Sequence, residues 1–235
     1  MKSKKVAISQ SNYIPWKGYF ENIKAVDEFV LYDDMQYTKR DWRNRNKIKT
    51  QEGLKWLTIP VIVKGNYYQK INETKISDHN WKRKHLATLR NVYSKAKCYG
   101  EVIEIVEMIY ETANQDTISE LNYHFLTKIC EFLKIDTKIS FSSNYKLLEN
   151  GKTERLVDLC KQLQATDYFS GPAAKNYMDV SLFENEGIKV HYYDYSNYPE
   201  YTQLYGKFEH GVSILDLIFN EGTTSKNFIK KYNFE

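Results

Sequence analysis

The sequence predicts an α/β fold with a mostly parallel sheet of about five strands, flanking helices and a helical insertion in the middle of the chain. Two observations lead to this class. Short apolar runs typical of buried strands alternate with segments of helical periodicity near both ends of the chain. The middle is helical, and we assign it to an insertion or subdomain at about residues 80–135 of one domain spanning residues 1–235.

The first half of the chain begins with the order strand, loop, helix, strand, which is a βαβ unit. Apolar runs define the strands, Pro15 and Gly18 punctuate the loop, and helical spacing defines the helix. Pro60 interrupts a later apolar run, which indicates an edge strand, a bulge or two short strands. The expected elements are a strand at 6–9, a loop at 10–18, a helix at 19–26, a strand at 28–32 and the interrupted run at 54–63.

The second half contains three helical segments and then returns to alternation. Residues 117–133 give the clearest amphipathic face, with apolar residues recurring from Ile118 to Leu133. The expected elements are helices at 80–93, 100–110 and 117–133, a strand at 138–142, a helix at 153–163, a strand at 167–170, a helix at 173–186 and a strand at 188–195.

Composition excludes several function classes. Hydrophobic residues make up 42% and charged residues 27% of the chain, as in ordinary globular proteins. The net charge of +4 is too weak for a nucleic-acid-binding surface, but a local phosphate or diphosphate remains a candidate ligand. The 20 tyrosines suit sugars, nucleotides or protein partners, although a coding bias that also raises Lys, Asn and Ile explains most of them.

The three cysteines, Cys98, Cys130 and Cys160, have neither CxxC nor metal-ligand spacing. We therefore expect reduced thiols, no metal site and a cytoplasmic protein. No apolar leader follows the N-terminus, and no segment approaches the roughly 18 apolar residues of a membrane span. The oligomeric state stays open.

The loop at residues 10–18 is the first candidate ligand site. It joins a strand to a helix, whose first N–H groups favour a phosphate or carboxylate. Neither known glycine-rich phosphate motif is present, and a structural turn with Trp16 in the core is the alternative. The candidate binding residues are Gln10, Asn12, Tyr13, Trp16 and Lys17.

A polar cluster follows the second strand. Adjacent residues on extended chain point to opposite faces, so at most one of Asp33 and Asp34 serves a given site. The same alternation sends one of Arg43 and Arg45 to the site and leaves the other to make structural pairs. A solvated charged face is the alternative reading. The candidate binding residues here are Gln36, Tyr37, Lys39, Arg40, Arg43, Asn44 and Arg45.

The third candidate is the turn at Ser170 and Gly171, which is either a helix cap or a ligand loop. Two lesser signals are weaker. Gly151-Lys152-Thr153 resembles the tail of a phosphate loop but lacks its earlier glycine, so a helix start is the better interpretation. His85 lies on a predicted helix and is the best general base available, although a single histidine is more often structural.

Several of these motifs resemble the WbqC-like protein family, from about residue 5 to residue 222. One departure is Ser11, where a proline is expected after the first glutamine. The motifs are Gln10-x-Asn12-Tyr13-x-Pro15-Trp16-x-Gly18-Tyr19-Phe20, Tyr32-Asp33-Asp34-x-Gln36-Tyr37-x-Lys39-Arg40-Asp41-Trp42-Arg43-Asn44-Arg45, Ser170-Gly171-Pro172-Ala173 and Ser213-Ile214-Leu215-Asp216-Leu217-x-Phe219-Asn220-x-Gly222.

The resemblance implies a role in bacterial O-antigen or other surface-polysaccharide biosynthesis, because family members are encoded in such gene clusters. Some are labelled glycine or acyl transferases acting on amino sugars. We therefore expect an enzyme that joins glycine or another acyl unit to a nucleotide-linked amino sugar. Asp33 or Asp34 would orient an amine or hydroxyl, and His85 would be the base.

Two alternatives stay open. The first is an enzyme of ATP-dependent nucleotidyl transfer, so ATP is a candidate cofactor. The second is a non-catalytic nucleotide-sugar binding or accessory protein, which fits the absence of a recognised nucleophile or triad in the sequence. In each case the partners are small molecules rather than nucleic acid.

Overall fold

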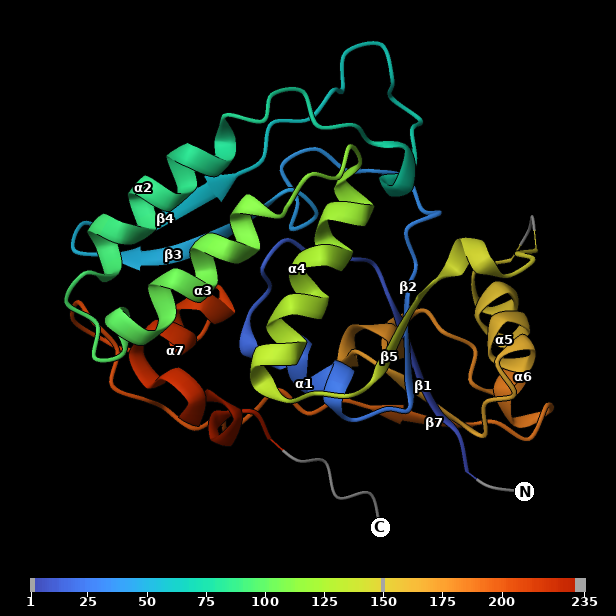
Figure 1. Ribbon diagram of the computed structural model, residues 1–235. Helices are drawn as coiled ribbons and strands as arrows, with labels where there is room; N and C mark the ends of the chain where they lie inside the picture. Colours follow the sequence, from blue (N-terminus) through green and yellow to red (C-terminus); the bar gives the residue numbers. More distant parts are fainter. Residues whose placement is uncertain (1–2, 149–150, 231–235) are drawn as a thin grey trace.

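The computed structural model describes residues 3–148 and 151–230. Its centre is a sheet of five strands in which every neighbouring pair is parallel. This confirms the predicted α/β class with its parallel sheet and flanking helices (Figure 1). The strands are β1 (Lys5–Ser9), β2 (Glu28–Leu31), β5 (Lys138–Phe141), β6 (Asp167–Ser170) and β7 (Lys189–Tyr192).

The strand order β5-β2-β1-β6-β7 places β1 at the centre of the sheet. The chain first runs outward from β1 to β2 and β5, and then returns to the other side of β1 for β6 and β7. Val6 consequently pairs with Glu28 on one side and with Tyr168 on the other. The order reverses between β1 and β6, and open α/β sheets bind their ligands at such a switch point.

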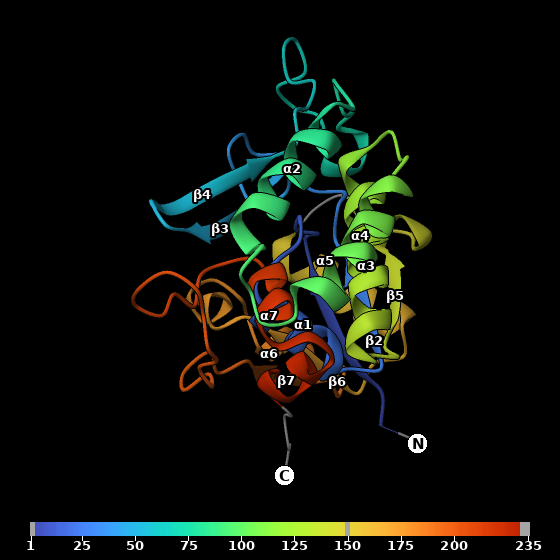
Figure 2. The same cartoon turned by 60° about the vertical axis from the view of Figure 1, so that its left-hand side comes forward.

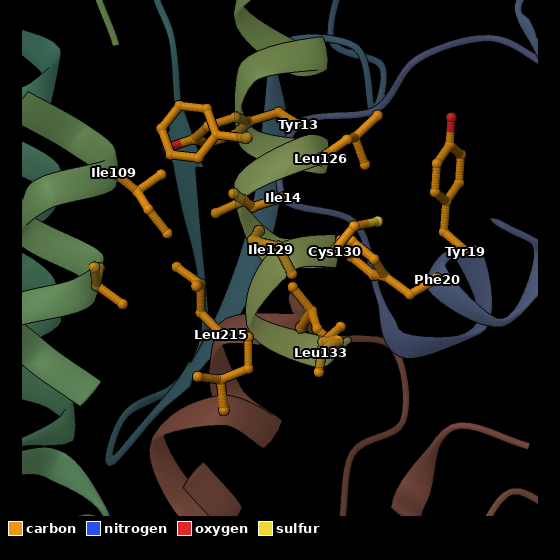
Figure 3. Packing of buried hydrophobic residues seen from close by; sticks show 14 of the residues in the cluster. Tyr13, Ile14, Tyr19, Phe20, Ile109, Leu126, Ile129, Cys130, Leu133 and Leu215 are labelled. Carbon is orange, nitrogen blue, oxygen red and sulfur yellow. The ribbon is translucent and has the colours of Figure 1, made fainter. Parts of the chain in front are cut away.

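Both faces of the sheet are covered, which is why each of its strands carries buried or half-buried apolar residues. Helices α5 (Lys152–Gln162) and α6 (Ser181–Glu184) lie on one face, and α1 (Lys17–Lys24) and α4 (Ile118–Leu133) lie on the other (Figure 1). On the second face, side chains of α1, α3 (Tyr99–Glu111), α4 and α7 (Ile214–Glu221) pack together with the loop that follows β1 (Figure 3).

The predicted helical insertion is present as α2 (Trp81–Tyr93), α3 and α4. Local sequence fixes the ends of α4. The Thr117 hydroxyl accepts a hydrogen bond from the Glu120 N–H at 3.3 Å, and Lys134 ends the helix in the left-handed conformation with a φ of 56°. Among the described residues, no helix is long and apolar enough to cross a membrane.

Two of the expected elements take a different form in the structure. The run at 54–63 becomes strand β4 (Gly53–Thr58), which ends before Pro60 and forms an antiparallel hairpin with β3 (Arg45–Thr50) apart from the main sheet (Figure 2). The single helix expected at 173–186 is a 3-10 turn (Pro172–Asn176) followed by α6, and between them the Asp179 carboxylate accepts hydrogen bonds from the N–H and hydroxyl of Ser181.

Candidate functional site

A cavity of about 500 Å³ lies at the switch point of the sheet. Ser9 and Gln10 line it at the end of β1, and Ser170 and Gly171 line it at the end of β6. The cavity therefore occupies the place where parallel α/β sheets hold their ligands. We call it the switch-point cavity.

Three cationic side chains line this cavity, namely Arg43, Lys152 and Arg155. None of its described lining residues is an aspartate or glutamate. A recess lined by charge of one sign attracts counter-ions, so this cavity favours an anion. Its aromatic and amide lining, which suits rings and hydroxyls, comprises Phe29, Tyr32, Tyr168, Phe169, Tyr177, Tyr193, Tyr195, Gln10 and Asn22.

Arg43 is the best-positioned cation. The side chain is buried, and its guanidinium donates a hydrogen bond to the side-chain oxygen of Gln10 and lies 3.7 Å from the Asp41 carboxylate. Its Nε is buried and has no hydrogen-bond partner in the described part of the chain. A buried donor without a partner is costly, and a planar guanidinium suits two oxygens of a phosphate or carboxylate.

Lys152 and Arg155 come from the first turn of α5, on the other side of the cavity. Arg155 hydrogen-bonds to the Tyr32 hydroxyl. Burial raises the Tyr32 pKa and the positive charge of Arg155 opposes that rise. The sequence analysis did not identify Arg155. It interpreted Lys152 as the start of a helix, and α5 does begin there. Their spacing of three residues, which puts both on one helix face, was the available signal.

Asn22 and Tyr195 were also missed. The Asn22 side-chain amide donates a hydrogen bond to the Tyr195 hydroxyl at 2.8 Å, and together they form part of the cavity wall. Residue 22 lies on α1 and residue 195 follows β7, so only the folded sheet brings them together. No local pattern marks either residue.

The structure places Asp33 and Asp34 outside the cavity lining. The buried Asp33 carboxylate accepts hydrogen bonds from the Ser11 N–H at 2.8 Å and the Ser119 hydroxyl at 2.5 Å. Burial raises its pKa, while these hydrogen bonds act in the opposite direction. Asp34 accepts from Asn72 at 3.2 Å and from Ser142. Both carboxylates thus tie the strand end to other elements.

His85 lies in the core rather than in the cavity. Its Nδ1 is 2.9 Å from the Tyr13 hydroxyl, and its Nε2 is 3.2 Å from the Thr58 carbonyl oxygen. The Tyr13 hydroxyl is also 2.6 Å from that of Tyr110, so the four groups form a buried chain. Burial lowers the His85 pKa to about 4. The imidazole is therefore neutral near pH 7, with both nitrogens already engaged.

The remaining residues of the loop at 10–18 lie elsewhere. Asn12 and Trp16 line a second cavity. Lys17 is buried, its ammonium donates a hydrogen bond to the Pro199 carbonyl oxygen at 2.5 Å and burial lowers its pKa to about 8. It also lies 5.3 Å from the ring centres of Tyr198 and Tyr201. Lys17 therefore fixes the segment after β7 against α1.

The other members of the polar cluster are separated from the switch-point cavity. Gln36, Tyr37 and Lys39 line another pocket, of about 280 Å³, together with residues of the loop at 63–69. The Arg45 guanidinium lies 4.0 Å from the Trp56 ring centre and donates to the carbonyl oxygen of the exposed Arg40. The Asn44 amide donates to the Ile59 carbonyl oxygen at 2.8 Å. Of this cluster, only Arg43 lines the switch-point cavity.

The residues that could hold a metal are dispersed. Within residues 3–148 and 151–230, no three His, Cys, Asp or Glu side chains gather closely enough to bind a metal ion. Burial raises the pKa of Cys130 to about 12, which keeps this thiol protonated. The cations, amides and tyrosines of the switch-point cavity suit an anionic, hydroxylated or aromatic ligand.

The fold and the cavity define an α/β protein with a cationic, tyrosine-lined cavity at the switch point of a parallel sheet. The chain belongs to the WbqC-like protein family, whose model matches residues 10–228. It is 50% identical over 227 residues to the uncharacterized protein Rv1507c of Mycobacterium tuberculosis, covering 97% of this chain and 98% of that protein. No solved structure matches the chain.

Proposed function

We propose that the protein binds a nucleotide-linked amino sugar in the switch-point cavity and forms an amide on its amino group. The acyl unit is an amino acid such as glycine or another acyl group, and the product enters O-antigen or surface-polysaccharide biosynthesis. The observation that carries this proposal is the grouping of Arg43, Lys152 and Arg155 beside tyrosine rings with no carboxylate among the described lining residues.

The cations suit the diphosphate of such a ligand. Arg43 and Arg155 each offer a planar fork for two phosphate oxygens, and Lys152 adds a point charge at the start of α5. Tyrosine rings suit the base and the sugar, and the Gln10 and Asn22 side chains suit hydroxyls. The volume of about 500 Å³ lies within the usual range of small-molecule sites.

The same cations favour the chemistry. An amine must be neutral to attack an acyl carbonyl, and nearby positive charges lower the pKa of an ammonium group. In the proposed step the sugar nitrogen bonds to the carbonyl carbon, the bond from that carbon to an activated leaving group breaks, and the amine proton passes to the leaving group or solvent. An ATP-derived acyl phosphate or a thioester supplies the activated carbonyl.

A second candidate is a binding protein without catalysis. The observation that favours it is the engagement of Asp33, Asp34 and His85 in structural hydrogen bonds outside the cavity. No Asp, Glu, His or Cys is among the described lining residues to replace them as a base. Such a protein would hold the nucleotide sugar for another enzyme.

Incubation of the purified protein with nucleotide-linked amino sugars, glycine and either ATP or acyl thioesters tests the proposal, with mass spectrometry of the sugar as readout. A mass gain equal to the acyl unit supports it. Thermal shift adds a binding readout, because a ligand at 100 times its dissociation constant stabilises by about 2.7 kcal/mol. Binding of nucleotide sugars without product from any donor would favour the second candidate. Stabilisation by ATP alone would favour nucleotidyl transfer.

A further inference from the structure

A second cavity, of about 350 Å³, lies behind the loop that follows β1. The functional proposal above does not use it. Its described lining residues come from the loop, from β3 and the segment before it, and from the segment before α7. They are Asn12, Pro15, Trp16, Trp42, Asn46, His210 and Gly211. We call it the tryptophan cavity.

The two cavities share a wall. Gln10 and Arg43 line the switch-point cavity, whereas Asn12 and Trp42, from the same two segments, line the tryptophan cavity. The Tyr13 N–H donates to the Trp42 carbonyl oxygen at 3.0 Å, which joins the segments along the wall. Each of the two segments therefore contributes side chains to both cavities.

An aromatic pair closes this wall. The Trp16 ring lies 5.3 Å from the Tyr195 ring, centre to centre, at an interplanar angle of 77°. Trp16 faces the tryptophan cavity and Tyr195 lines the switch-point cavity. One ring of this pair therefore belongs to each cavity.

The tryptophan cavity is preformed. The Asn46 amide donates to the carbonyl oxygens of Tyr13 and Ile14 at 3.0 Å each. Ile14 has a φ of 35°, a conformation that a branched residue adopts only when its surroundings impose it. Fixed backbone beneath Trp16 and Trp42 reduces the entropy lost when a ligand binds.

The lining chemistry selects the ligand. No Lys, Arg, Asp or Glu is among the described lining residues, and the Lys47 ammonium approaches the Trp42 ring centre only to 5.8 Å, so a phosphate or carboxylate finds less counter-charge here than in the switch-point cavity. A purely apolar ligand would leave Asn12 unmatched, because its Oδ1 is buried and has no hydrogen-bond partner in the described part of the chain. His210, which is half exposed, adds a second polar group at the rim.

We propose that the tryptophan cavity binds a neutral pyranose ring. A pyranose has an apolar C–H face that packs on an indole and hydroxyls at its edge that hydrogen-bond to an amide or imidazole. Trp42 is 40% exposed, so its indole is available without rearrangement. The site is separate from the nucleotide site and does not depend on the proposed amide chemistry.

The test is titration of the purified protein with methyl pyranosides of glucose, galactose, rhamnose and N-acetylglucosamine. Tryptophan fluorescence and saturation-transfer NMR report binding. We expect saturable binding of at least one glycoside, weakened about two- to tenfold by Trp42→Ala, since a ring contact contributes about 0.5–1.5 kcal/mol. Asn12→Ala should also weaken glycoside binding, and it replaces Trp42→Ala as the test if that variant does not fold.

Trp56→Ala is the matched control, because Trp56 is 37% exposed and lies 5.3 Å from Trp42 but does not line the cavity. It should leave glycoside affinity unchanged. Absence of saturable binding by every glycoside, or equal losses in the Trp42 and Trp56 variants, would overturn the inference.

Uridine diphosphate separates this inference from the functional proposal. If the sites are distinct, saturating diphosphate should not displace the methyl glycoside, and Arg43→Lys should weaken only the diphosphate. Displacement of the glycoside by the diphosphate would show that the pyranose occupies the switch-point cavity, which overturns the inference. Glycoside binding without any binding of nucleotides would instead count against the functional proposal alone.

Discussion

The Arg43 guanidinium donates a hydrogen bond to the side-chain oxygen of Gln10, which lies 33 residues earlier in the chain. This contact fixes a cation at the carboxyl end of the central strand. Two residues further along, Arg45 instead stacks on Trp56 at 4.0 Å. Two arginines of nearly the same sequence context therefore have different surroundings, and substitution can distinguish them.

Arg43→Lys should weaken nucleotide-sugar binding by about 1.5–3 kcal/mol, because lysine offers no planar fork for a phosphate and cannot reproduce the bond to Gln10 with the same geometry. Arg45→Lys should change ligand affinity by less than about 0.5 kcal/mol. Isothermal titration calorimetry on both variants measures the difference. Equal, negligible effects would show that Arg43 does not hold the ligand.

His85→Gln should flatten the pH dependence of stability. The His85 pKa of about 4 in the folded protein is below the ordinary value of 6.5. The part of the free energy of unfolding that depends on a neutral His85 is therefore fully present above pH 6.5. It is lost as the pH falls toward 4, by about 2 kcal/mol between pH 7 and pH 5. Urea unfolding of the wild type and the His85→Gln variant between pH 7 and pH 5 measures this pH dependence. Unchanged nucleotide binding in the variant would agree with a structural role, and a large loss would not.

Glu28→Gln should destabilise the protein at neutral pH by about 1–3 kcal/mol. Burial alone would raise the Glu28 pKa, but hydrogen bonds from Lys138, Ser140, Lys4 and Tyr145 outweigh it and lower the pKa to about 2. The stabilisation is present above the ordinary pKa of about 4.5 and is lost as the pH falls toward 2. The difference in free energy of unfolding between wild type and variant, measured with denaturant, should therefore become smaller as the pH falls from about 4.5 to about 2.

Gly18→Ala should lower the free energy of unfolding by about 1–3 kcal/mol, because a Cβ at residue 18 would lie 2.4 Å from the Trp16 ring. Gly100→Ala is the matched control, since nothing lies within 4 Å of a Cβ there and the residue is likewise second in its helix. It should stabilise by about 0.5 kcal/mol. Thermal unfolding measures the stability of both variants. A Gly18→Ala variant as stable as the wild type would show that the Trp16 indole can move aside.

Periodicity predicted the sheet well because its inner strands β1 and β2 are largely buried and each strand contains a short apolar run. The β3–β4 hairpin was predicted poorly, because β4 has mostly exposed side chains and β3 alternates charged and buried residues. Its pairing depends on register between the strands, such as Lys47 opposite Trp56, rather than on either segment alone.

The candidate site divides in the same way. Gln10, Ser170 and Gly171 follow strands directly, so topology alone leads to them. Asn22, Arg155 and Tyr195 reach the cavity from three other elements, and the sequence carries no sign of their meeting. Asp33 and His85 have the chemistry of catalytic residues, but in the structure they hydrogen-bond to residues distant in sequence. Asp33 bonds to Ser119 and His85 to Thr58, and these contacts hold the fold together.

The central position of β1 has a consequence for synthesis of the chain. Lys5 pairs with Asp167, so the strand that completes one edge of β1 leaves the ribosome only after most of the protein has been made. Until then β1 presents unpaired N–H and C=O groups and an apolar surface, both of which favour aggregation. Contacts between residues so distant in sequence also slow folding. Fragments that end before residue 167 should therefore require chaperones to remain in solution.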